Sequence, residues 1–161
     1  MTATKEVLGV FARSILAKVQ ALKLELTKTQ RMRLRRSITE DIRTCGGLIY
    51  PDMKSPEVSK AAAREAKRRK VDLCKMNWHK QPAFDPGRKM FQWEHVCTVR
   101  SIQARCETAQ SEDAVLQILN SCLRIAWILK REDKELTRLG YGNVRDDPDA
   151  AYSEAKIELL K

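Results

Sequence analysis

Apolar residues recur every three or four positions along most of this chain, which is the spacing of helices that pack through one face. One such stripe predicts a core helix over about residues 4–26, and another predicts a helix over residues 99–109. A longer stripe predicts one continuous helix over residues 111–140. A short terminal helix is predicted to begin at residues 146–149, where acidic residues and a proline suit a first turn.

Capping signals predict two more helices. Residues 27–30 and 37–40 each have the spacing of a capping box, so either could begin a second helix. We expect that helix to end near Cys45, because the glycine pair 46–47 could supply a left-handed stop. The pattern Ser-Pro-Glu then predicts a third helix over residues 55–76.

The segment 76–99 interrupts the helical pattern and contains both histidines and two of the three tryptophans. From residue 90 onward its side chains alternate, which predicts a strand with His95 on one face and Glu94 on the other. A strand needs a partner, and either the loop around Phe84 or the stretch 48–50 could supply it. This aromatic segment, punctuated by prolines, is the predicted location of any chemistry.

These patterns together predict one domain spanning residues 1–161. The fold class is mainly α, a compact helical domain with a short two-stranded β element around residues 90–99. A chain of 161 residues is long enough to bury a sizeable core.

The charge of the chain favours a polyanionic partner. There are 31 Lys and Arg against 21 Asp and Glu, a formal net charge of +10. Nucleic acid is the commonest such partner, with DNA favoured here, and an acidic protein is the alternative.

The five cysteines are odd in number and form no C-x-x-C pair, as expected of reduced thiols in a cytoplasmic protein. No apolar run is long enough for a membrane span, and the start of the chain lacks a signal-peptide cleavage pattern. Glycine-rich nucleotide loops and serine nucleophile elbows are also absent from the sequence.

Glu94-His95 at the end of an extended segment resembles the first element of the HNH, or His-Me finger, endonucleases. The resemblance covers at most residues 91–120. It implies that His95 is the general base that activates water against a phosphodiester and that Glu94 binds a divalent metal. A later metal ligand of that family would fall on Asn120, 25 positions beyond His95.

The residues themselves suggest a second way to complete a metal site. His79 and Asp85 precede and enter the turn that returns the chain to Glu94 and His95, so a tight turn would bring all four together. The expected cofactor is Mg²⁺ or Mn²⁺, with Zn²⁺ as the alternative. An ordinary structural role for each of these residues is the competing interpretation.

The predicted phosphate-binding residues are basic side chains of the second and third helices and the following turn. They are Arg33, Arg36, Arg64, Lys67, Arg68, Lys70 and Arg88. The sequence therefore favours a small metal-dependent DNA endonuclease. The alternative function is a regulator or inhibitor without catalytic activity that binds nucleic acid or protein through its basic helices.

Overall fold

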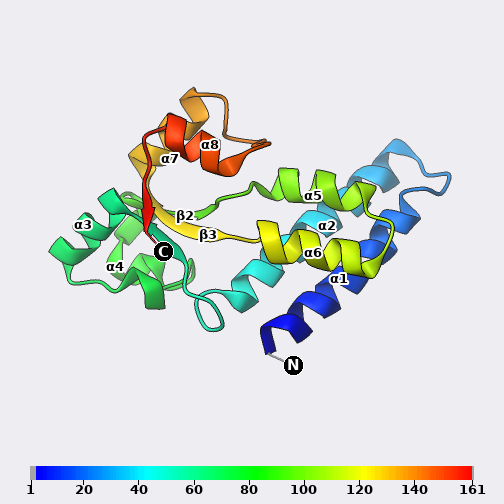
Figure 1. Cartoon of the computed structure of the whole chain (residues 1–161), viewed down its shortest axis with the longest axis horizontal. Coiled ribbons are helices and arrows are strands. Elements are labelled where there is room, and N and C mark those ends of the chain that lie inside the picture. The colour runs from blue at the N-terminus through cyan, green and yellow to red at the C-terminus, as the bar shows by residue number, and fades with distance from the viewer. Residues whose placement is uncertain (1–2, 161) are drawn as a thin grey trace.

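The computed structural model describes residues 3–160 and confirms a mainly helical fold, with a small sheet in one half of the molecule (Figure 1). The helices are α1 (Ala3–Ala21), α2 (Lys28–Ile49), α3 (Lys60–Arg69), α4 (Gln81–Phe84), α5 (Val99–Thr108), α6 (Glu112–Cys122), α7 (Lys130–Arg138) and α8 (Pro148–Glu154). Two 3₁₀ turns are η1 (Leu73–Lys75) and η2 (Pro86–Arg88). The strands are β1 (Glu57–Ser59), β2 (Phe91–His95), β3 (Ile125–Leu129) and β4 (Leu159–Leu160).

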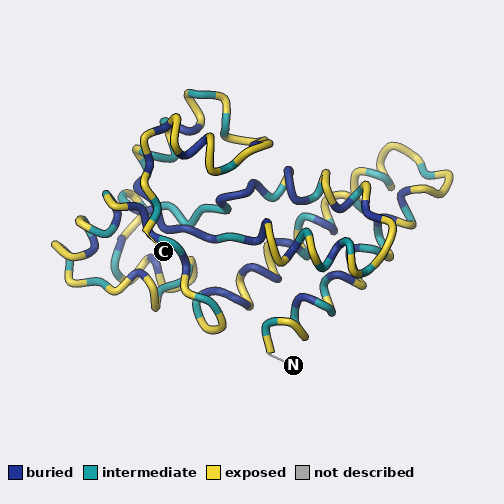
Figure 2. Tube along the Cα trace, viewed as in Figure 1, coloured by how far each residue is buried: buried dark blue, intermediate teal, exposed yellow. Residues whose placement is uncertain are grey.

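Helices α1, α2, α5 and α6 form one half of the molecule (Figure 1). Their apolar stripes meet in a shared core, which appears as buried segments along the facing sides of the helices (Figure 2). Ile15 of α1, Ile38 and Ile42 of α2, Ile102 of α5 and Leu119 of α6 are all completely buried there. The predicted periodicity of these segments is thus satisfied by helix-on-helix packing.

The sheet forms the other half, with strand order β2-β3-β1-β4. Strand β2 runs antiparallel to β3, with Trp93 opposite Trp127, and β1 runs parallel to β3. One face packs on α3 through Phe91 and Trp127, and the other face packs on α7 and α8. The sheet therefore has four strands instead of the expected two, and it is covered on both faces.

Helix α2 begins at the first of the two candidate capping boxes and runs past its predicted end. The Thr27 side chain accepts from the backbone N–H of Gln30, and the Gln30 side chain accepts from the N–H of Thr27. The glycine pair does not stop the helix, which continues to Ile49. A Cβ on Gly46 would lie 3.4 Å from Cε1 of His95, so this glycine allows the helix to approach β2 closely.

The prediction of one helix over residues 55–76 is wrong at both ends. Its first residues form β1, because pairing with β3 and β4 satisfies their backbone groups. Ser59, not Ser55, is the N-cap, and its hydroxyl accepts from the N–H of Ala62. Helix α3 ends when Lys70 adopts the left-handed conformation.

The predicted helix over residues 111–140 is divided by a strand. All five residues of β3 are buried, because helices cover both faces of the sheet at this strand. A short, fully apolar run fits a central strand and cannot be distinguished from a buried helix by periodicity alone. β3 is therefore the partner of β2, which corrects the expectation that residues near Phe84 or 48–50 would pair with it.

Candidate functional site

An open cleft of about 710 Å³ lies where the C-terminal half of α2 meets β2 and the segment after η1. Two tryptophans and both histidines of the chain line it: Trp78, His79, Trp93 and His95. Cleft volumes of roughly 300–1,000 Å³ are usual for ligand sites. The structure thus brings together His79 and His95, as the sequence suggested.

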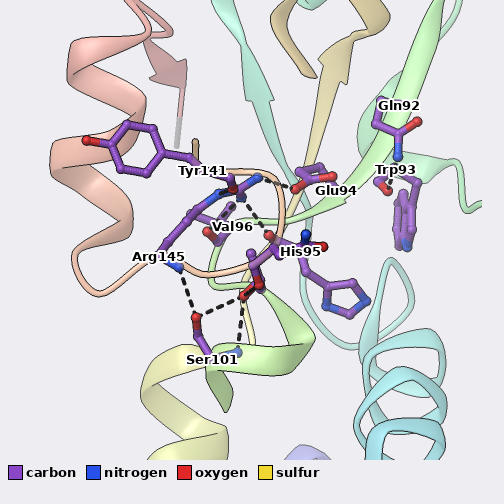
Figure 3. Close-up of polar contacts among 10 residues, drawn as sticks. Gln92, Trp93, Glu94, His95, Val96, Ser101, Tyr141 and Arg145 are labelled. Atoms are coloured by element: carbon purple, nitrogen blue, oxygen red, sulfur yellow. Dashed lines mark hydrogen bonds and ion pairs between the residues drawn. The ribbon is translucent and has the colours of Figure 1, made fainter. Parts of the chain in front are cut away.

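His95 reaches this cleft because alternate residues of β2 face α2 (Figure 3). Its Nδ1 is inaccessible to solvent and has no hydrogen-bond partner within residues 3–160. Burial, together with the positive charges of Arg43 and Arg145, lowers the pKa of His95 to about 4. The imidazole is therefore neutral at pH 7 and able to accept a proton.

Glu94 points to the opposite face of the sheet, away from the His95 ring (Figure 3). Its Oε1 lies 2.7 Å from Nη2 of Arg145, in an ion pair that is almost completely buried. Burial raises the pKa of Glu94, and the guanidinium of Arg145 opposes that shift. Adjacent strand residues diverge, so these two side chains do not approach one reacting atom from the same cleft.

Arg145 was not among the residues singled out from the sequence, yet it organises this region. Its Nη1 donates to the carbonyl oxygens of His95 at 3.0 Å and Val96 at 3.1 Å, and its Nε donates to that of Tyr141 at 2.8 Å. Only 1% of its surface is exposed. It stands among charged and polar neighbours in a loop after Gly142, so no sequence signal distinguished it from a solvated arginine.

The other two expected metal ligands lie elsewhere. Asp85 is buried, and its carboxylate accepts from the backbone N–H groups of Lys89, Met90 and Phe91. These bonds lower its pKa against the opposing effect of burial, so Asp85 acts as the turn-former that closes the loop. Asn120 is exposed on α6.

The expected ligand set of Glu94, His79, Asp85 and Asn120 is therefore not assembled. Across the described part of the chain, no three His, Cys, Asp or Glu side chains lie close enough together to hold a metal ion.

A second concave surface, about 510 Å³ in volume, lies between α2 and α5. It adjoins the cleft at Arg43, which lines both. We call it the arginine groove and define it by Arg35, Arg36, Arg43 and Arg100. Arg35 is held by Glu107 through two short contacts, Nε to Oε1 at 3.0 Å and Nη2 to Oε2 at 2.9 Å. Arg36 and Arg100 make no ion pair with any residue in 3–160, and Arg43 makes a long one of 3.4 Å with Glu40.

Of the predicted phosphate-binding residues, Arg36 alone lines the groove. Arg33 is exposed on α2 but does not line the groove. Arg64 and Lys67 on α3, and Lys70 at its end, are also exposed outside the groove. Arg68 pairs with Glu65 at 2.7 Å, which lowers the pKa of that carboxyl to about 2. Arg88 stacks on Trp78 beside the cleft, with its guanidinium carbon 3.7 Å from the ring centroid.

Comparison with known proteins gives no relative for this arrangement: no protein family, curated protein or solved structure matches the chain. None of the helices within residues 3–160 is both long enough and apolar enough to cross a bilayer.

The lowered pKa of His95 predicts a pH-dependent stability. In the unfolded chain His95 binds a proton near the ordinary histidine pKa of about 6.5, whereas in the folded protein it does so only near pH 4. Between these values the unfolded state holds more protons, so stability falls as the pH falls. His95 should contribute a loss of about 2 kcal/mol between pH 7.5 and pH 5.

Urea denaturation of the unmodified protein and of His95→Gln at both pH values measures that loss. The difference between the two proteins isolates the imidazole, because all other titrating groups are shared. An equal pH dependence in the two proteins would mean that the folded state accepts the proton on His95 freely.

Proposed function

We propose that this protein binds nucleic acid, with DNA favoured, through the arginine groove and the cleft that continues from it. The observation that carries the proposal is a concave surface holding four arginines and one glutamate, which remains positive after Arg35 pairs with Glu107. Guanidinium groups bind phosphate oxygens through paired N–H donors. The formal net charge of +10 adds long-range attraction to a polyanion.

Binding to labelled DNA, measured by fluorescence anisotropy over a range of salt concentrations, tests this proposal. Contact with phosphates releases counterions, so the logarithm of the affinity should fall linearly with the logarithm of the salt concentration, by roughly 0.9 per phosphate neutralised on a duplex. No retention of DNA or RNA at low ionic strength would leave an acidic protein as the better partner.

A second candidate function is hydrolysis of a phosphodiester, with His95 as general base. It is supported by a neutral imidazole in a cleft that adjoins the arginine groove. The negative charge of a bound phosphate would raise the pKa of that imidazole toward neutrality, which would make it a better base. Glu94, held by Arg145, would position the strand that carries His95 instead of meeting the substrate.

Conversion of supercoiled plasmid to its nicked form tests the hydrolytic candidate. The reaction is run with Mg²⁺, with Mn²⁺ and with chelator, so that a cation arriving with the substrate is not missed. His95→Ala should lower the nicking rate by about 100-fold or more, the usual contribution of a general base. An unchanged rate in His95→Ala would remove the catalytic part of the proposal and leave DNA binding intact.

We also propose a cytoplasmic location. All five cysteines are free thiols in the structure, and four of them are buried, which is consistent with a reducing compartment.

A further inference from the structure

We propose that the cleft beside the arginine groove holds an unpaired nucleobase, so that the protein selects single-stranded or locally unpaired nucleic acid. This inference rests on the proposed function, because the same groove supplies the phosphate contacts. It adds the substrate class, which neither the charge nor the predicted motif specifies.

The walls of the cleft provide aromatic surface for stacking. Trp93 lies on the cleft-facing side of β2, packed against the buried Trp127 with ring centroids 4.9 Å apart. Trp78 lines the same cleft and is 44% exposed. Bases stack on such rings regardless of sequence, because every base presents a π face.

Arg88 holds the exposed indole in place. Its guanidinium lies over one face of Trp78, and its Nη2 donates to the carbonyl oxygen of the same residue at 3.3 Å. The His79 ring packs edge-on against the same indole, with ring centroids 5.2 Å apart, and 44% of Trp78 remains exposed to a ligand. A rigid aromatic surface loses little conformational freedom when a base stacks on it.

Polar groups in the cleft could read the edge of a base. The Oδ1 of Asn77 accepts from the N–H of Lys80 at 3.0 Å, which leaves the amide NH₂ of Asn77 to donate elsewhere. The acceptors on the edge of a base are suitable partners for this NH₂ group.

Arg43 connects the cleft to the groove, since it lines both. A strand whose phosphates follow Arg36 and Arg100 would pass Arg43 and present its next base at the cleft. In a duplex the bases are stacked and paired inside the helix, so a base reaches such a cleft only from a single strand or after it is flipped out. This geometry therefore predicts a preference for unpaired bases.

Anisotropy with three labelled probes of equal length tests this inference: an oligothymidylate, an abasic strand with the same backbone, and a duplex. We expect the oligothymidylate to bind about tenfold more tightly than the abasic strand. Trp78→Ala should reduce that ratio to about one, whereas the matched control Met53→Ala, an exposed apolar residue outside the cleft lining, should leave it unchanged.

The outcomes separate the two proposals. Equal affinity for the oligothymidylate and the abasic strand in the unmodified protein would overturn the base-binding inference and leave phosphate binding standing. Failure to bind any of the three probes would overturn the proposed function itself. The comparison within the unmodified protein needs no variant, so the inference stays testable even if Trp78→Ala does not fold.

Discussion

Replacing Arg145 by methionine is expected to lower the free energy of unfolding by about 3–5 kcal/mol, the range for removing one partner of a buried ion pair. The change leaves the Glu94 carboxylate buried without its partner. It also removes the donors to the carbonyl oxygens of His95, Val96 and Tyr141. Methionine has a similar length and no charge, so the loss reports mainly on polar groups left unsatisfied.

Urea denaturation followed by circular dichroism measures this change. Arg138→Ala is the control, because Arg138 pairs with Glu135 on an exposed helix face, where the loss of an ion pair has little effect on stability. Adding Glu94→Gln to Arg145→Met should recover part of the loss, since the unpaired charge is then gone. If Arg145→Met were as stable as Arg138→Ala, the buried network would contribute little to stability.

Changing Arg36, Arg43 and Arg100 together to alanine is expected to weaken DNA binding by at least about tenfold at low salt. The slope of log affinity against log salt should become shallower by about three, because each phosphate that is no longer neutralised reduces the slope by roughly one. The reason is that Arg36 and Arg100 have no acidic partner in the described chain and Arg43 has only a distant one. Their charges are therefore free to meet phosphates.

The other basic surface of the molecule offers a control of equal charge. Arg64, Lys67 and Lys70 are also exposed, and they lie on the part of the molecule built from α3 instead of α2 and α5 (Figure 1). Changing these three to alanine removes the same charge and should alter the affinity less than the groove variant does. Equal effects in the two variants would show that net charge alone drives binding, without a defined groove.

The fold class could be predicted from the sequence because helix stripes depend on residues three and four positions apart. The first helix begins within one residue of its predicted start but ends at Ala21 instead of near residue 26, and the helix after Thr98 spans Val99–Thr108, close to its predicted range of 99–109. Of the two candidate capping boxes, the structure uses the one at Thr27. The prediction was wrong where a short apolar run had two possible structures. Residues 125–129 fit a buried helix or a buried strand equally well, and only pairing with β1 and β2 decides between them.

The candidate site was predictable only in part. The sequence singled out His79 and His95, which the structure places in one cleft, but it also grouped them with Glu94 and Asp85, which face other surroundings. Side-chain direction on β2 was correctly predicted from alternation. What lies beyond each face depends on which distant segments pack there, and that is why Arg145 could not be recognised in advance.

The sequence by itself therefore determined a basic, mainly helical chain whose aromatic segment carries both histidines, because composition and periodicity are local properties. The tertiary structure alone decided which residues share a surface. It paired Arg145 with Glu94 and aligned the arginines of α2 and α5 beside the cleft. These are contacts between residues far apart in the chain, and no local pattern encodes them.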